Sequence, residues 1–410
     1  MAMIAVTSEQ LLGRYPLRLR WSLRTMLAGV ALVAVVCAWF VNARQRAQEE
    51  DKLIARVQPS DGVVYLKGRG PAWLDLFGAG RLRRRIVGAY IRDVTRENEV
   101  EFLKRLAKSP QLRYLEVQPE LIPEAEVVLG EMRQLRTLRM RCRMYDQLAI
   151  LAAVGKLAEL ERLGVSVSLA GPGDLDPLAG LTNLKALTLD VRSEIDPHDG
   201  LAALAKLPRL EHLLLTTWQV STVDLASIAG LKKLKSLRIQ CMPGGLAPLP
   251  ALPQLEALDL TQLPGGDADL GRLADCPRLK SLCLAQTGVS ATGLASLASV
   301  ESLRELAIDE DTLTAEGLES LAALKNLKRL HITHVMEEYT DNDVSCSIVL
   351  DDGQPLVVPS SGLDRLRQAI DSLRRAHPGI VIDTDYQGFE EREFQRLFEL
   401  APPPGSHPAL

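Results

Sequence analysis

Two short runs of polar residues have the side-chain types that bind metal ions. His331 and His334 are three residues apart, and Asp341 and Asp343 have the spacing with which a calcium-binding loop begins. The histidines end an apolar, strand-like run, where residues three apart point to opposite faces. No glycine or glutamate follows the aspartates at the spacing that a calcium loop requires. We therefore predict a structural or solvated histidine pair and a polar turn, and no metal site.

The sequence also lacks the common motifs of catalysis. It has no Gly-x-x-x-x-Gly-Lys loop for phosphates, no His-Glu-x-x-His pair and no Gly-x-Ser-x-Gly nucleophile elbow. Its six cysteines do not suggest a disulfide framework, and we interpret them as free thiols. Cys283 is predicted to point outward from a strand. We expect that the chain is not an enzyme and binds no cofactor.

The remaining candidates are residues that could bind a partner. Arginine and tyrosine are enriched where the binding energy of protein interfaces concentrates. Arginines also favour an anionic or carboxylate-rich partner, with an affinity that weakens as salt rises. The alternative interpretation is that they keep the surface soluble or neutralise acids such as Glu116 and Glu161. The candidate contacts are Tyr114, Arg139, Arg141, Arg162, His212 and Arg238.

A sequence repeat must position these residues. Ten copies of Leu-x-x-Leu-x-(Leu/Ile/Val/Met) run from Leu112 to Ile332, with first leucines 21 to 26 residues apart. A steady period in this range is the signature of a solenoid, which is first of all a surface that holds another molecule. The first leucines are Leu112, Leu135, Leu160, Leu184, Leu210, Leu234, Leu255, Leu279, Leu303 and Leu327.

Each copy predicts one strand and one short helix. The second and third apolar positions are two residues apart, which places both on one face of a strand. A second block, such as Leu178-Ala179-Gly180-Leu181, has the apolar spacing of a helical turn. One such unit cannot bury both of its apolar edges, so the stack is the stable object. We predict a right-handed α/β horseshoe with about ten to eleven parallel strands, counting Ile86–Ala89–Ile91 as a degenerate first copy.

This pattern resembles the leucine-rich repeat over roughly residues 86 to 333. The best copies run from Leu279 to Val300 and from Leu303 to Leu324, where Thr287-Gly288-Val289 and Glu316-Gly317-Leu318 match the short bacterial form. The family often carries an asparagine at the ninth repeat position, where it forms a hydrogen-bonded ladder along the turn. This chain has other residues there, for example Ser168 and Thr287, so we expect that ladder to be missing.

The same register divides the strand residues between two faces. Counted from the first leucine, positions 4 and 6 point into the core, and positions 3, 5 and 7 project from the opposite sheet face. That face is predicted to be basic in the early copies and more acidic toward the ninth. Position 2 alternates in sign and predicts lateral pairing between strands through Glu161, Lys185, Glu211, Lys235, Glu256 and Lys280.

An apolar segment precedes the repeats. The seventeen residues from Thr25 to Val41 carry no charge, and at about 1.5 Å per residue they span about 26 Å, near the lower limit for crossing a bilayer. Trp21 and Trp39 flank the segment, as is typical of membrane interfaces. We predict a transmembrane helix over residues 25–41. More arginines precede it than follow it, which favours a cytoplasmic N-terminus and repeats outside the inner membrane, an arrangement that resembles membrane-tethered repeat proteins of bacteria.

Three other interpretations of this segment remain open. A cleaved signal peptide would need small residues before the cut, and Val41-Asn42-Ala43 is a passable match. A lipoprotein signal would need a small residue in place of Val36, directly before Cys37. A buried globular helix would need a partner that covers it.

The domain boundaries follow from these segments. We predict an N-terminal cytoplasmic segment over residues 1–24, a transmembrane helix over 25–41, and a stalk with an N-terminal cap over 42–85. The leucine-rich repeats occupy residues 86–333, a C-terminal cap 334–400 and a flexible tail 401–410.

Composition limits the class of partner. The 410 residues have a formal net charge of −4, which gives no general attraction to nucleic acid. We therefore predict a membrane-anchored, non-catalytic scaffold that binds a protein or another macromolecule through its concave sheet face. The alternative is a soluble adaptor such as a substrate receptor of a ubiquitin ligase. That role needs an F-box-like module before the repeats, and residues 45–85 are too short and too charged for one.

Overall fold

The computed structural model describes the greater part of the chain, in two compact units. The units are Met1–Lys52 with Arg69–Arg84, and Leu53–Gly68 with Arg85–Leu410. The described residues are 23–57, 63–68, 84–91, 96–117, 123–140, 147–168, 173–192, 200–218, 222–223, 225–242, 245–246, 249–261, 267, 270–309, 314–333, 345–349, 355–359, 363–383 and 407–408. Arg141, His334, Asp341 and Asp343 lie outside them.

The second unit is built on one long sheet. Its order is β17-β14-β13-β12-β11-β9-β7-β6-β5-β4-β3-β2-β1-β18, and the neighbours from β2 to β14, and β14 with β17, pair in parallel. The repeat strands are β2 (Arg84–Ile91), β3 (Tyr114–Val117), β4 (Thr137–Met140), β5 (Arg162–Val167), β6 (Ala186–Arg192), β7 (His212–Trp218), β9 (Ser236–Met242), β11 (Ala257–Asp259), β12 (Ser281–Cys283), β13 (Glu305–Asp309) and β14 (Arg329–Thr333). These eleven strands confirm the predicted leucine-rich-repeat solenoid.

The leucines of successive copies lie next to each other across the strands. Leu115 pairs with Leu138, and Leu138 pairs in turn with Leu163. This register continues as far as Leu330, and the second leucines of all ten copies are buried in one continuous apolar core. The periodic sequence therefore determines both the strand order and the face of each strand that is buried.

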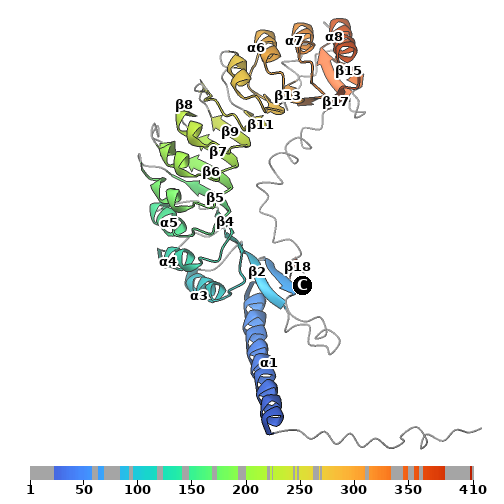
Figure 1. Ribbon diagram of the computed structural model, residues 1–410. Coiled ribbons are helices and arrows are strands. Elements are labelled where there is room, and N and C mark those ends of the chain that lie inside the picture. The colour runs from blue at the N-terminus through green and yellow to red at the C-terminus, as the bar shows by residue number, and fades with distance from the viewer. Residues whose placement is uncertain are drawn as a thin grey trace, which may run out of the picture. The chain divides into compact units, whose positions relative to one another are not determined.

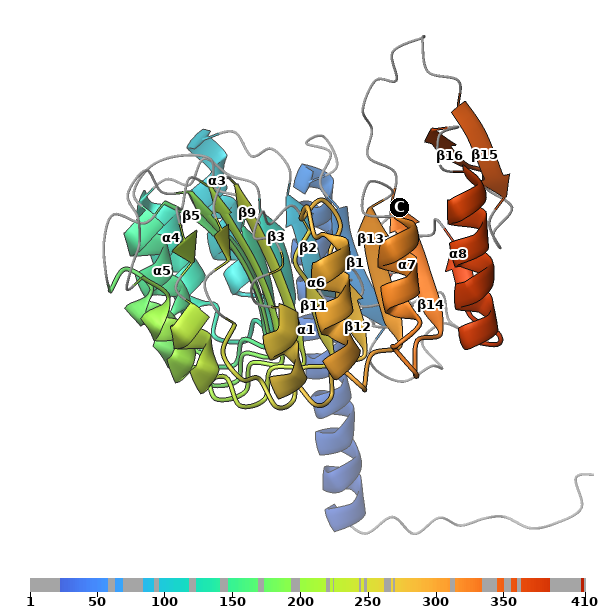
Figure 2. The same cartoon turned by 90° about the horizontal axis from the view of Figure 1, so that it is seen from above.

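The helical segments lie on the other side of the leucine core from the sheet, as Figures 1 and 2 show. Some copies use α-helices and others use tighter 3₁₀ turns. The α-helices are α3 (Arg96–Ala107), α4 (Pro123–Glu131), α5 (Gln147–Val154), α6 (Ala291–Ser296) and α7 (Ala315–Leu321). The 3₁₀ segments are η3 (Asp176–Gly180), η4 (Gly200–Lys206), η5 (Leu225–Gly230), η6 (Leu270–Asp275) and η7 (Leu297–Ser299).

Glycine allows two of these helical segments to approach closely. A Cβ atom at Gly155 would lie 2.3 Å from the carbonyl oxygen of Pro177, and one at Gly180 would lie 2.5 Å from the carbonyl oxygen of Gly155. Both distances are shorter than real Cβ contacts. No residue with a side chain fits at these two positions unless the backbone moves.

In several copies, the polar residue just before the first leucine donates a hydrogen bond to a backbone carbonyl of the preceding repeat. Asn183 Nδ2 donates to the Ala158 carbonyl at 2.9 Å, and Asn326 Nδ2 donates to the Glu301 carbonyl at 2.7 Å. Ser302 Oγ donates to the Leu279 carbonyl at 2.7 Å. These bonds give backbone carbonyl groups in the turns a hydrogen-bond partner. At the ninth position, Thr287 Oγ1 donates instead within its own turn, to the Leu284 carbonyl at 2.7 Å.

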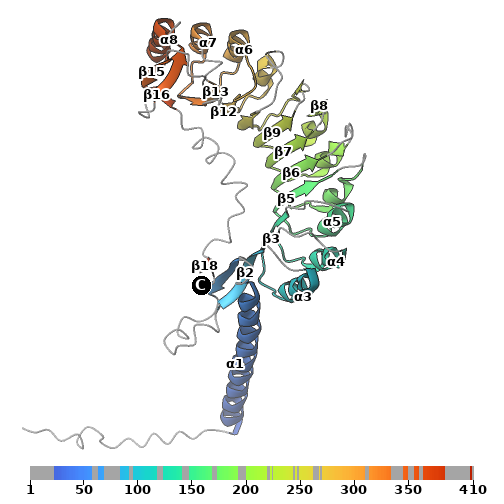
Figure 3. The same ribbon diagram turned by 180° about the vertical axis from the view of Figure 1, so that it is seen from behind.

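Further elements lie at the ends of the repeats. At the N-terminal end, β1 (Val63–Gly68) pairs antiparallel with β18 (His407–Pro408). At the C-terminal end, α8 (Leu363–Ala376) buries Leu366, Ala369, Ile370 and Leu373, and β17 (Val381–Asp383) extends the sheet. Two smaller sheets are present, β8 (Thr222–Val223) with β10 (Gly245–Leu246) and β15 (Ser345–Val349) with β16 (Pro355–Pro359) (Figure 3).

The helix α1 (Leu23–Val57) contains the predicted transmembrane segment. Among the described residues it is the one helix long and apolar enough to cross a membrane. The large apolar side chains of residues 26–41 are exposed, while the charged part of the helix that follows carries a Lys52–Glu49 ion pair of 2.7 Å. The exposed large apolar residues are Met26, Leu27, Val30, Leu32, Val33, Val35, Val36, Trp39, Phe40 and Val41.

Candidate partner-binding face

The strand face opposite the leucine core carries every candidate contact that the structure describes. Strand pairing places the residues at position 5 in one row across the sheet. The row runs Glu116, Arg139, Gly164, Thr188, Leu214, Arg238, Asp259, Cys283, Ala307, His331 and Asp383. Exposure along this row divides the face into a closed part and an open part.

The closed part begins at β9 and contains a buried ion pair. Arg238 Nε lies 2.9 Å from Asp259 Oδ2, and both side chains are almost fully buried. Thr261 donates to Asp259 Oδ1 through its amide at 2.9 Å and its hydroxyl at 2.5 Å, and this hydroxyl lies 3.3 Å from Cys283 Sγ. Arg238 is therefore not an open contact residue. Cys283 does point away from the leucine core, but it is buried with Ala285 and Ala307.

A second buried pair holds the C-terminal strand to the last repeat. His331 Nδ1 on β14 lies 2.5 Å from Asp383 Oδ1 on β17, and Arg329 Nη1 lies 3.3 Å from Asp383 Oδ2. Burial lowers the pKa of His331, although the Asp383 carboxylate opposes this effect. The neutral imidazole is thus the favoured form at neutral pH.

The first repeat strands are closed by aromatic packing. Tyr114 is 3% exposed, and its ring packs edge-on against Tyr65 of β1 with centroids 5.8 Å apart. Its hydroxyl donates to Glu116 Oε2 at 2.7 Å, and burial with this bond raises the pKa of Tyr114. Glu116 Oε1 also lies 3.6 Å from Arg139 Nη1. The sequence placed Tyr114 on this face but did not predict that the cap strand would cover it.

The open part covers β4 to β7. Arg139 retains 30% side-chain exposure, and Arg162 and His212 are half-buried. Thr188 and Leu214 lie between them at similar exposure. Among the described residues no hydrogen bond or ion pair engages the guanidinium of Arg162. Three of the six predicted contacts, Arg139, Arg162 and His212, thus lie together on an accessible surface.

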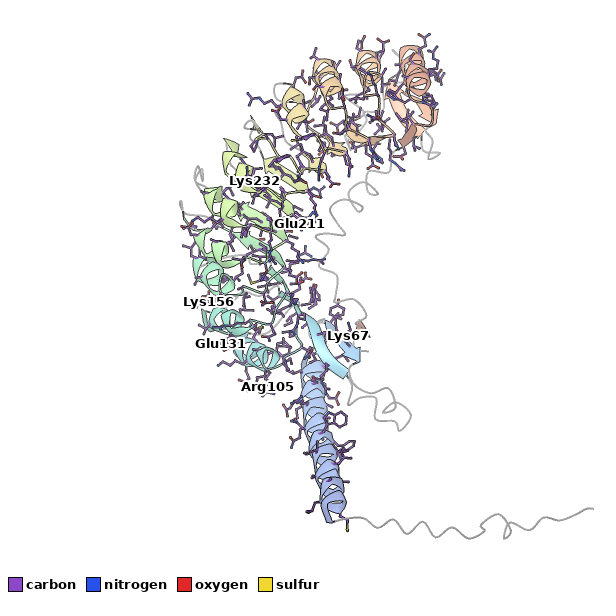
Figure 4. All side chains as sticks on the ribbon, viewed as in Figure 1. Lys67, Arg105, Glu131, Lys156, Glu211 and Lys232 are labelled. Atoms are coloured by element: carbon purple, nitrogen blue, oxygen red, sulfur yellow. The ribbon has the colours of Figure 1, made fainter. Side chains whose placement is uncertain are left out.

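The residues at position 2 alternate in charge, and as predicted they form ion pairs between adjacent strands. Lys185–Glu161, Lys235–Glu211 and Lys280–Glu256 are 2.8, 2.6 and 2.6 Å apart. Hydrogen bonds from these lysines lower the pKa of Glu161 and Glu211. Figure 4 shows Glu211 on the strand side of the repeats and Lys156 on the helical side.

Sequence reasoning named Glu116 as an acid that the arginines on this face could neutralise, but it missed Asp259. Glu116 pairs with Arg139 across β3 and β4, and Asp259 pairs with Arg238 across β9 and β11. A comparison of the residues at position 5 in consecutive copies would have found both pairs, because in each pair the two residues are oppositely charged and one repeat apart. Within the described part of the chain, no group of three or more His, Cys, Asp or Glu residues could hold a metal ion.

Comparison with known proteins gives matches only among solved structures. No protein-family model and no curated protein matches the chain. An internalin from Listeria monocytogenes is 17% identical, with 66% of this chain and 88% of that chain covered and a TM-score of 0.35. TLR13, solved with an RNA, is also 17% identical, with 60% and 35% covered and a TM-score of 0.40. The plant peptide hormone receptor RGFR1 is 14% identical, with 56% and 50% covered and a TM-score of 0.34, so the chain spans half or less of these two receptor chains.

Proposed function

Taking the leucine-rich-repeat solenoid as the premise, we propose that this chain is a membrane-tethered, non-catalytic docking module for another protein. The observation that carries the proposal is the open strand face of β4 to β7. Apart from the buried Gly164 and Ala186, the described residues at positions 3, 5 and 7 of these four neighbouring strands are half-buried, whereas the rest of the described face is largely buried. A surface held by paired strands loses little conformational freedom when a partner binds, which favours affinity.

The exposed apolar surface of α1 supports the membrane tether. Ten large apolar side chains of this helix face solvent. Burying a side chain of this size is worth about 1.5–3 kcal/mol, so a bilayer would remove a penalty of roughly 15–30 kcal/mol. The excess of arginines before the helix favours a cytoplasmic N-terminus, with the repeats on the other side of the membrane.

Cell fractionation tests the tether and its orientation. The full chain is expected in the membrane fraction after a carbonate wash, and protease added to intact spheroplasts should degrade the repeats. Recovery in the soluble fraction would support a soluble adaptor instead. Protection of the repeats in sealed spheroplasts, with degradation only after lysis, would reverse the orientation.

Site-specific photo-crosslinking tests the docking face. A photoreactive residue in place of Thr188, at the centre of β4 to β7, should give discrete protein adducts in cells. The same residue in place of Lys156, which is exposed on the helical side, serves as the matched control and should give none. Adducts from Lys156 alone would move the docking site to the helices.

A further inference from the structure

Three basic side chains surround the two smallest residues of the open face. Strand pairing places Arg162, Ala186 and His212 in one row, and Arg139, Gly164 and Thr188 in the next row. At about 4.8 Å between strands, Arg162 and His212 start about 10 Å apart with only the Ala186 methyl group between them. We name Arg139, Arg162 and His212 the basic cluster.

Glycine at this place in a strand is informative. Gly164 lies inside β5, where a residue without a side chain weakens the strand and marks a bulge, a bend or a place where a ligand or another backbone approaches closely. Together with Ala186 it leaves the central positions of the basic cluster without polar groups of their own. A group that binds here would meet the basic side chains at its edges and the strand backbone beneath it.

The cluster has unused capacity to donate hydrogen bonds. No described group accepts from the Arg162 guanidinium, and His212 Nδ1 is shielded from solvent without a hydrogen-bond partner. Arg139 is ion-paired with Glu116 at 3.6 Å, so Arg162 is the guanidinium of the cluster that has the most capacity left. The nearest acid on the same face of β6 is Asp190, and Ser166 donates to its Oδ2 at 3.1 Å.

Burial and neighbouring charges of both signs set the protonation of His212. Burial lowers the pKa of His212, Glu211 opposes this effect, and Lys235 and Arg162 lower the pKa further. An anion placed between Arg162 and His212 would reverse this balance, because it favours the protonated imidazole. Binding of an anion would then be coupled to uptake of a proton.

We infer that the basic cluster binds a carboxylate of the partner protein, presented by an acidic, extended segment. The inference rests on the docking function proposed above and specifies the chemistry of that site. Arginine recognises a carboxylate through two parallel N–H bonds, and protonated His212 adds a third donor. The chain's net charge of −4 gives no general attraction to nucleic acid, so we assign the site to a protein carboxylate.

Peptide binding to the full chain in detergent micelles tests the inference. The probe is an acetylated, amidated peptide of alternating glycine and glutamate, and its control has glutamine in place of glutamate. Anisotropy should show at least tenfold tighter binding of the glutamate peptide. The preference should grow as the pH falls from 8 toward 6, while the NMR signal of His212 titrates at higher pH in the complex.

Three variants locate the effect. Arg162→Gln should weaken binding of the glutamate peptide about 10- to 100-fold, as expected for a charged hydrogen bond. His212→Gln should abolish the pH dependence. Lys232→Gln removes one positive charge from an exposed turn and should leave binding unchanged. Unchanged thermal unfolding of the variants would show that each one folds.

The outcomes separate the carboxylate site from the docking function. Equal affinity for the two peptides, or equal losses in Arg162→Gln and Lys232→Gln, would overturn the carboxylate site. If crosslinks from Thr188 persist in that case, the docking function stands. If they are also missing, both proposals fail.

Discussion

Replacing Asp259 with asparagine tests whether burial or distance decides the strength of ion pairs in these repeats. The Asp259–Arg238 pair is 2.9 Å long, with side-chain exposures of 0% and 7%. The Glu211–Lys235 pair is shorter, at 2.6 Å, but its side chains are 30% and 47% exposed. Asparagine keeps the size of Asp259 and an oxygen that can accept from Thr261, so the change removes mainly the charge.

The expected magnitudes differ severalfold. Removing one partner of a buried ion pair costs about 3–5 kcal/mol, because the remaining charge stays away from water without compensation. Removing one partner of an exposed pair costs about 0–1 kcal/mol. Asp259→Asn should therefore reduce the free energy of unfolding by several kcal/mol, and Glu211→Gln by 1 kcal/mol or less, although the second pair is closer.

Urea unfolding of the full chain in micelles, followed by circular dichroism, measures both losses. With a slope of roughly 3 kcal/mol per molar urea, Asp259→Asn should lower the midpoint by about 1 M or more, and Glu211→Gln by about 0.3 M at most. Combining Arg238→Met with Asp259→Leu should recover much of the loss, since an apolar pair needs no compensation. A loss below 1 kcal/mol for Asp259→Asn, or equal losses for the two single variants, would refute the reasoning.

Three further predictions concern the core, the helical side and acid stability. Leu258→Asp places an unpaired charge in the leucine core and should cost several kcal/mol, seen as faster hydrogen exchange in β11; unchanged exchange would contradict the register. Gly155→Ala should lower thermal stability by about 1–3 kcal/mol because its Cβ would clash with a neighbouring carbonyl, whereas Gly271→Ala, with no atom within 4 Å, should not destabilise the chain. Burial holds the pKa of His331 below its ordinary value near 6.5, so the unfolded chain binds the proton first and stability is lost as the pH falls below about 6.5. His331→Asn should flatten this dependence of the urea midpoint on pH, and an unchanged slope would exclude His331 as its source.

Much of the fold could be predicted because each repeat encodes the same local rule. The second leucine of each copy, such as Leu138 or Leu282, marks both the strand and its buried side. The alternating charges at position 2 likewise predicted contacts such as Lys280–Glu256, since equivalent positions in adjacent repeats must be neighbours.

The accessibility of the candidate site could not be predicted in the same way. Tyr114 is covered by Tyr65, which belongs to a cap strand outside the repeat pattern. Arg238 is buried in an ion pair with Asp259. The spacing of the two residues in the sequence indicates that they are neighbours, but it does not show that both side chains are buried. The hydrogen bond from Asn183 could not be predicted, because its acceptor is a backbone carbonyl. Every residue has such a carbonyl, so the residue type does not show which one accepts.

The alternating charges at position 2 restrict how such a protein can lengthen or shorten during evolution. Each of Lys185, Lys235 and Lys280 bonds to the glutamate of the preceding repeat, so the charges recur every two repeats. Losing one repeat from this region would bring two like charges onto adjacent strands, whereas losing or duplicating two would restore the pattern. A change by two repeats therefore keeps these ion pairs, whereas a change by one repeat loses some of them.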